Sequence, residues 1–262
     1  MTPQQLLDPL PILAIFALFA ILAGVAYEVG FRVGRWWQKR TPDEKEGPTG
    51  MLVGSILALL AFLIAVTMSM ASDRFDQRRA LVLAEANSIG TTYLRAGYLP
   101  EPTSTETREL LRAYVPLRVN VADREQLAAN FVRSAALLDQ MWAKAEALAR
   151  TTDRGDLVAI YIESLNETID LHETRVTAIV YARVPETILL LLLAGSILTL
   201  GMVGYSAGLT GRRSVVTAVA LVIALGAVLT LIVDLDRPRE GFLQVSQQPL
   251  VDLQQQIGPP TQ

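Results

Sequence analysis

The chain has 262 residues, of which 51% are hydrophobic and 19% are charged, and its formal net charge is −3. So small a charge gives no sign of nucleic acid as a partner, and the absence of cysteine excludes disulfides, thiolate metal sites and cysteine nucleophiles. The hydrophobic residues are concentrated in four blocks, so we predict an all-α integral membrane protein with four transmembrane helices in a lipid bilayer.

The first block covers residues 10–31, about the 20 apolar residues that a bilayer requires. No Lys or Arg precedes this block, so it lacks the basic region of a signal peptide. Trp36 and Trp37 follow it, and such residues are typical of the membrane–water interface. We therefore expect residues 1–50 to form a retained first transmembrane helix and a basic loop.

The second block, residues 51–72, runs into charged residues without a break. Neither Gly nor Pro occurs between Gly54 and Gly90, so the membrane helix should continue as one rod into the polar segment. Residues 73–185 form that segment, which lacks strand patterns and has apolar residues at helical spacing. A helical domain is thus predicted between the second and third spans.

Residues 186–234 contain the third and fourth blocks, joined by a tight turn at Gly211, and predict a transmembrane hairpin. Gly204 and Gly208 have the spacing of small residues at a close helix contact. The remaining residues, 235–262, form a C-terminal tail with apolar side chains at helical spacing. We expect this tail either to dock on a neighbouring subunit or to be loosely held.

Three segments carry a family resemblance: residues 61–100, which include SDRFDQRR, LNETIDLHETR at 165–175, and DLDRPREGFLQVSQQPLVDL at 234–253. They resemble the bestrophin-like family of four-span membrane proteins, and the similarity extends from residue 51 onward. That family is distantly similar to bestrophin anion channels, which are pentamers whose second helix lines the pore. The resemblance implies a bacterial homo-oligomer, a pentamer on the bestrophin pattern, that conducts chloride.

Phe62 and Val66 lie one turn apart, at two positions of the hydrophobic neck that the resemblance implies. Such a neck closes a pore by dewetting. Ala58 departs from the pattern, because a third bulky apolar residue is expected there. The alternative for Phe62 and Val66 is that they face lipid or pack against other helices.

Charged residues follow where the second span leaves the membrane. In an oligomer, Arg74, Arg78 and Arg79 would form a positive ring that concentrates anions. The alternative is that these arginines are interfacial anchors or ion-pair partners of acidic neighbours such as Asp73.

Asp234, Asp236 and Arg237 end the fourth span and are candidates for structural ion pairs. They would form either a local pair at the helix end or an interhelical salt bridge to Arg74 or Arg78. His172 is the only histidine, and a lone histidine without cysteine is a poor zinc site. We therefore expect no metal, no cofactor and no enzymatic activity, and we assign His172 to structural hydrogen bonding.

Two arguments about membrane orientation disagree. The arginines and lysines of the loop after the first span and of the hairpin favour placing both loops in the cytoplasm. The bestrophin resemblance instead places the helical domain in the cytoplasm, and we adopt that orientation in the inner membrane. An alternative function without transport is a membrane-anchored helical sensor or scaffold that binds a partner protein.

Overall fold

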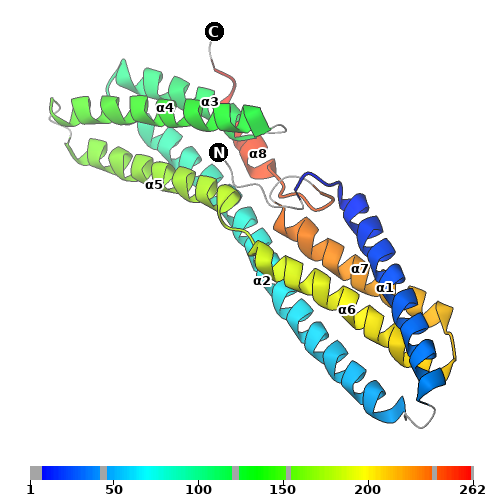
Figure 1. Cartoon of the computed structure of the whole chain (residues 1–262). Helices are drawn as coiled ribbons and strands as arrows, with labels where there is room; N and C mark the ends of the chain where they lie inside the picture. The colour runs from blue at the N-terminus through cyan, green and yellow to red at the C-terminus, as the bar shows by residue number, and fades with distance from the viewer. Residues whose placement is uncertain (1–7, 42–45, 120–123, 152–154, 238–240, 261–262) are drawn as a thin grey trace. The chain divides into compact units, whose positions relative to one another are not determined.

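The computed structural model describes residues 8–41, 46–119, 124–151, 155–237 and 241–260. These residues form eight α-helices and no strand (Figure 1). Four of the helices, α1, α2, α6 and α7, are long and apolar enough to cross a membrane. The prediction of an all-α protein with four spans, and with a helical domain between the second and third, is confirmed. The helices are α1 (Ile12–Arg40), α2 (Glu46–Ala96), α3 (Thr103–Val119), α4 (Arg124–Ala149), α5 (Gly155–Val180), α6 (Glu186–Thr210), α7 (Val215–Asp236) and α8 (Gln248–Ile257).

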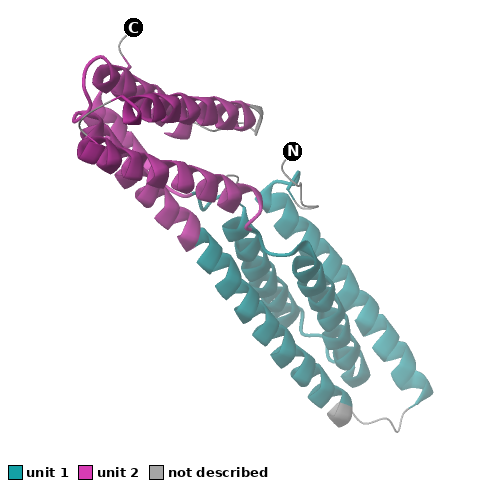
Figure 2. Ribbon diagram, turned by 90° about the vertical axis from the view of Figure 1, so that its left-hand side faces the viewer, with its two compact units in different colours: residues 1–75, 183–244 teal, residues 76–182, 245–262 magenta. Residues whose placement is uncertain are grey.

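The chain folds into two compact units (Figure 2). Unit 1 comprises Met1–Phe75 and Arg183–Gln244, and unit 2 comprises Asp76–Ala182 and Val245–Gln262. Helix α2 contributes to both units and is unbroken from Glu46 to Ala96, as expected from a segment without Gly or Pro where it leaves the apolar block.

Glycines hold α1 and α6 of unit 1 at backbone contact. A Cβ added at Gly204 of α6 would lie 2.1 Å from the carbonyl oxygen of Tyr27 in α1, and one at Gly208 would lie 2.4 Å from that of Phe31. Gly34 of α1 contacts the other helix in the same way. This is the close packing that Gly204 and Gly208 predict, because only a residue without a side chain fits between the two backbones.

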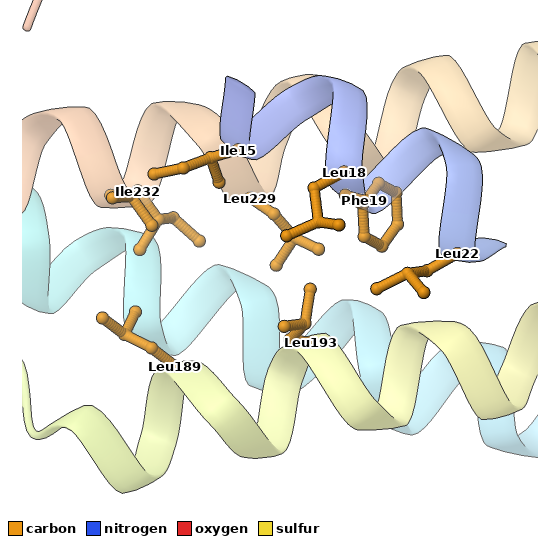
Figure 3. Close-up of a pocket in the computed structure, with 9 residues that line it drawn as sticks. Ile15, Leu18, Phe19, Leu22, Leu189, Leu193, Leu229 and Ile232 are labelled. Carbon is orange, nitrogen blue, oxygen red and sulfur yellow. The ribbon is translucent and has the colours of Figure 1, made fainter. Parts of the chain in front are cut away.

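Helices α2, α6 and α7 meet in an apolar core within unit 1. Its buried side chains include Leu60, Ile64, Leu189, Leu192 and Ile232. A small apolar cavity of about 40 Å³ lies between α1, α6 and α7 (Figure 3). Its walls are aliphatic and aromatic, so it offers no polar group to a ligand.

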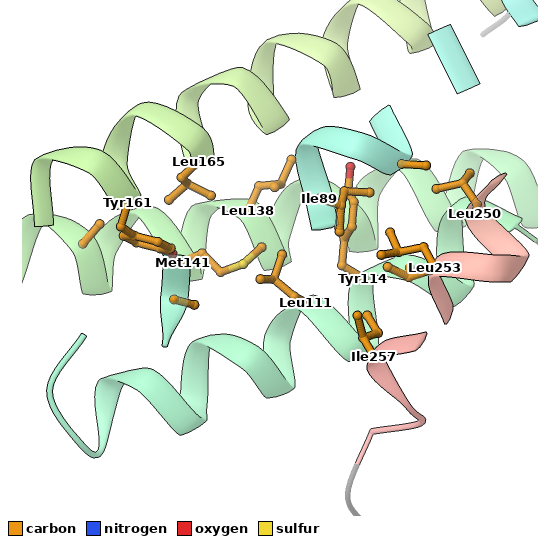
Figure 4. Close-up of a cluster of buried hydrophobic side chains, with 14 of the residues drawn as sticks. Ile89, Leu111, Tyr114, Leu138, Met141, Tyr161, Leu165, Leu250, Leu253 and Ile257 are labelled. Carbon is orange, nitrogen blue, oxygen red and sulfur yellow. The ribbon is translucent and has the colours of Figure 1, made fainter. Parts of the chain in front are cut away.

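Unit 2 has its own core, to which α8 contributes an entire face (Figure 4). Leu250, Leu253 and Ile257 of α8 are buried among side chains of α2 and α3. Arg112 donates from Nε to the carbonyl oxygen of Ile257 at 2.8 Å, and Arg175 donates to the side chain of Gln247. The tail therefore docks within its own chain, which neither expectation for it had foreseen.

Candidate functional site

One face of α2 is exposed within unit 1. Phe62 and Val66 are 63% and 45% exposed, whereas Leu60 and Ile64 are buried in the core with α6 and α7. Ala58 is also exposed. Phe62 and Val66 thus take no part in packing the core of their own unit, and this face of α2 is available to lipid or to another copy of the chain.

The charged residues beyond Phe62 divide between different faces of α2. An α-helix turns about 100° per residue, so Asp73 lies within about 20° of Phe62, and it is exposed. Arg74 lies about 120° away by the same count. Arg78 and Arg79 also lie about 100° or more from Phe62, and Arg78 is buried. The helix therefore brings Asp73, and none of the three arginines, onto the face of Phe62 and Val66.

Asp234 and Arg237 bind backbone groups at the end of α7. Asp234 accepts hydrogen bonds from the backbone N–H groups of Phe242 at 2.9 Å and Leu243 at 3.0 Å. Arg237 donates from Nη2 to the carbonyl oxygen of Leu10 at 2.8 Å. These contacts fix the segment that precedes α1 and the segment that follows α7. They also give the two buried charges hydrogen-bond partners, which offsets the cost of removing a charge from water.

Asp236 pairs with an arginine that the sequence had not indicated. Arg183 donates from Nε to Asp236 at 3.1 Å and from Nη1 to Asp8 at 2.8 Å. Asp236 also accepts from the backbone N–H of Val184 at 2.6 Å. Burial lowers the pKa of Arg183, but its bonds to Asp8 and the charges of Asp236 and Asp8 outweigh burial and raise that pKa above its ordinary value.

Unit 2 contains a cluster of buried ion pairs that the sequence analysis did not predict. Glu85 of α2 is fully buried and accepts from Arg118 Nε of α3 at 2.6 Å. Its other oxygen accepts from Arg175 of α5. Tyr114 donates its hydroxyl to Glu85 at 3.2 Å. One carboxylate thus ties three helices together, because each of its oxygens is satisfied by a different helix.

His172 extends this cluster through Tyr114, whose hydroxyl lies 3.0 Å from the ring nitrogen Nδ1. Burial, assisted by the positive charge of Arg118, lowers the pKa of His172 from 6.5 to about 4. Burial also raises the pKa of Tyr114 far above its ordinary value. Both side chains are therefore neutral near pH 7 and serve the structural hydrogen bonding expected of His172.

The depressed pKa of His172 predicts that unit 2 loses stability in acid. Between pH 6.5 and 4 the unfolded chain binds a proton at this residue and the folded chain does not, so stability is complete above pH 6.5 and declines as the pH falls. The loss is ~3 kcal/mol across this window. Urea titrations at pH 7 and pH 4.5, followed by the fluorescence of Trp142 in a W36F/W37F background, measure it.

His172→Gln cannot acquire this charge, so its urea midpoint should fall less between the two pH values than that of the parent. An equal fall in both proteins would mean that His172 does not contribute to the acid sensitivity.

Comparison with known proteins agrees with this architecture. A model of the Bestrophin-like domain matches residues 13–250. The structure is similar to that of a bacterial bestrophin homolog from Klebsiella pneumoniae, with 13% identity, a TM-score of 0.67, and coverage of 94% of this chain and 97% of that chain. A point mutant of that homolog gives 14% identity with the same TM-score and coverage.

At these identities the structural likeness shows the fold alone. No curated protein has a significantly similar sequence. The family model, in contrast, spans most of the chain and confirms the resemblance seen in the sequence. The chain belongs to the Bestrophin-like family.

Proposed function

We propose that the chain is the subunit of a homo-oligomeric chloride channel, a pentamer on the bestrophin pattern, in which α2 lines the pore. The observation that carries this proposal is the exposed apolar face of α2 with Phe62 and Val66 one turn apart. When several copies surround an axis, this face forms an apolar ring at each of the two levels. Apolar constrictions of this kind gate ion flow by dewetting.

Ion flux from liposomes tests the proposal directly. Liposomes that contain the purified full-length protein should release chloride faster than empty liposomes. Phe62→Ala widens the constriction and should increase the flux several-fold. Val216→Ala, at an exposed apolar position of α7, should leave the flux unchanged. Protein that releases no ion at any pH or calcium concentration would contradict the proposal and favour the sensor or scaffold function.

A cation channel of the same architecture is the second candidate, and the position of Asp73 favours it. Asp73 shares the exposed face of Phe62 and Val66, whereas Arg74 lies about 120° away. In an oligomer this face would present a ring of carboxylates, which is typical of cation-selective pores. Reversal potentials in a salt gradient distinguish the two ions. Asp73→Asn should shift the selectivity toward chloride if the ring lies in the pore. An unchanged reversal potential would exclude a ring of Asp73 carboxylates in the pore.

We further propose that the protein lies in the inner membrane with unit 2 in the cytoplasm. The family supports this orientation, whereas the basic loops of unit 1 argue for the opposite one. The chain has no cysteine, so a single Ala143→Cys change on exposed α4 gives one labelling site. A membrane-impermeant thiol reagent should label it only after lysis. Labelling of intact cells would reverse the proposed orientation.

A further inference from the structure

One end of unit 1 gathers cations from two separate parts of the chain. The contacts of Gly34 with Tyr205 and of Gly208 with Phe31 place the α6–α7 turn beside the end of α1 (Figure 1). We call this set of exposed cations the basic end; its members are Arg32, Arg35, Lys39, Arg40, Arg212 and Arg213.

The carboxylate at the basic end is already engaged. Glu28 accepts from Arg32 Nε at 2.8 Å, and its other oxygen accepts from Arg213. Among the described residues, the remaining four cations of the basic end have no carboxylate within 4 Å. Asp43 and Glu44 follow in the sequence and lie outside the described residues. Among the residues that the structure describes, Arg35, Lys39, Arg40 and Arg212 are thus exposed cations without a carboxylate partner.

Two tryptophans place the basic end at the level of lipid headgroups. Trp36 and Trp37 are 49% and 40% exposed, and the guanidinium carbon of Arg40 lies 3.9 Å from the ring centroid of Trp36. Exposed indoles at the end of a membrane helix lie at the membrane–water interface. Cations beside them are at the depth of the lipid phosphates, where anionic headgroups attract Lys and Arg.

We propose that the basic end binds the headgroups of anionic phospholipids, with Arg35, Lys39 and Arg212 contacting the phosphates. This site is independent of ion conduction and of which side of the membrane it faces. Each cation at an anionic membrane surface is worth roughly a fivefold preference over a neutral lipid.

Quenching of Trp36 and Trp37 by brominated lipids measures this preference in the full-length protein. The W142F background removes the third tryptophan, so the remaining fluorescence comes from the basic end. In vesicles of phosphatidylcholine, brominated phosphatidylglycerol should quench more strongly than brominated phosphatidylcholine at the same mole fraction. The fitted relative binding constant should exceed tenfold, consistent with two or three headgroup contacts.

The triple variant R35Q/K39Q/R212Q leaves Arg40 in place and should lower this constant several-fold. The control R133Q/K144Q/R150Q removes the same charge from α4, where Arg133 and Arg150 are exposed and Lys144 is partly exposed, and should leave the constant unchanged. In the unmodified basic end, raising the salt concentration should weaken the preference, which tests the site even if the variant misfolds. Inorganic phosphate at constant ionic strength should not displace the lipid. Equal quenching by the two lipids, or a preference that the triple variant does not reduce, would overturn the proposal.

Discussion

Glu85→Gln is expected to destabilise unit 2 by about 3–5 kcal/mol. Glu85 is the carboxylate between Arg118 and Arg175, and all three side chains are buried. Removing its charge leaves two guanidinium groups in the core without a counter-charge, and burial of an uncompensated charge costs far more than loss of an exposed ion pair. The urea midpoint of unit 2, followed by Trp142 in the W36F/W37F background, should therefore fall sharply.

Glu163→Gln is the matched control for this experiment. Glu163 pairs with Arg95 at 3.5 Å, but its side chain is largely exposed, and such pairs contribute about 0–1 kcal/mol. Its urea midpoint should stay close to that of the parent. The double variant E85Q/R118M should recover part of the stability lost in E85Q, because it also removes one of the two buried guanidinium charges that E85Q leaves without a counter-charge. If E85Q and E163Q had the same midpoint, the buried cluster would not hold unit 2 together.

Gly204→Ala is expected to separate α1 from α6 and to destabilise unit 1 by about 3 kcal/mol or more. The new Cβ would lie 2.1 Å from the carbonyl oxygen of Tyr27 and 2.9 Å from its carbonyl carbon. Both are backbone atoms, so no side-chain rotation relieves the clash and the helices must move apart. Thermal melting of the detergent-solubilised protein should show a clearly lower midpoint.

Two other glycines of the same helices provide controls. A Cβ at Gly24 of α1 meets no atom within 4 Å, and one at Gly195 of α6 makes an ordinary contact of 3.7 Å with Leu60. Gly24→Ala and Gly195→Ala should melt close to the parent protein. A similar loss in all three variants would show that helix propensity or lipid contact, rather than the α1–α6 contact, sets the midpoint.

Local pattern was sufficient to predict the membrane architecture. An apolar run of bilayer length indicates a spanning helix without reference to the rest of the fold. The lack of Gly and Pro between Gly54 and Gly90 correctly indicated that α2 continues unbroken into the polar segment. The spacing of Gly204 and Gly208 predicted a close helix contact because small residues serve that purpose in membranes.

The charged contacts could not be predicted in the same way. Asp236 pairs with Arg183, 53 residues away, and Glu85 pairs with Arg175, 90 residues away. Periodicity shows which face of a helix is buried but not which distant helix covers it. A carboxylate between Val82 and Ile89, within an apolar helical stripe, was the available signal that Glu85 is buried and needs cationic partners. Likewise, the apolar spacing in the tail predicted a helix but not the core that receives it.

The division of the chain constrains the order in which the protein can be completed during synthesis. The chain passes between the two units after Phe75, Ala182 and Gln244. Unit 2 therefore lacks α8 until the ribosome has produced both helices of the transmembrane hairpin. During that interval the surfaces that later contact Leu250 and Ile257 are uncovered, and nascent domains in that condition are prone to misassembly. Synthesis of the hairpin must precede closure of the unit 2 core, so a pause in its translation would prolong the exposure of an incompletely folded domain.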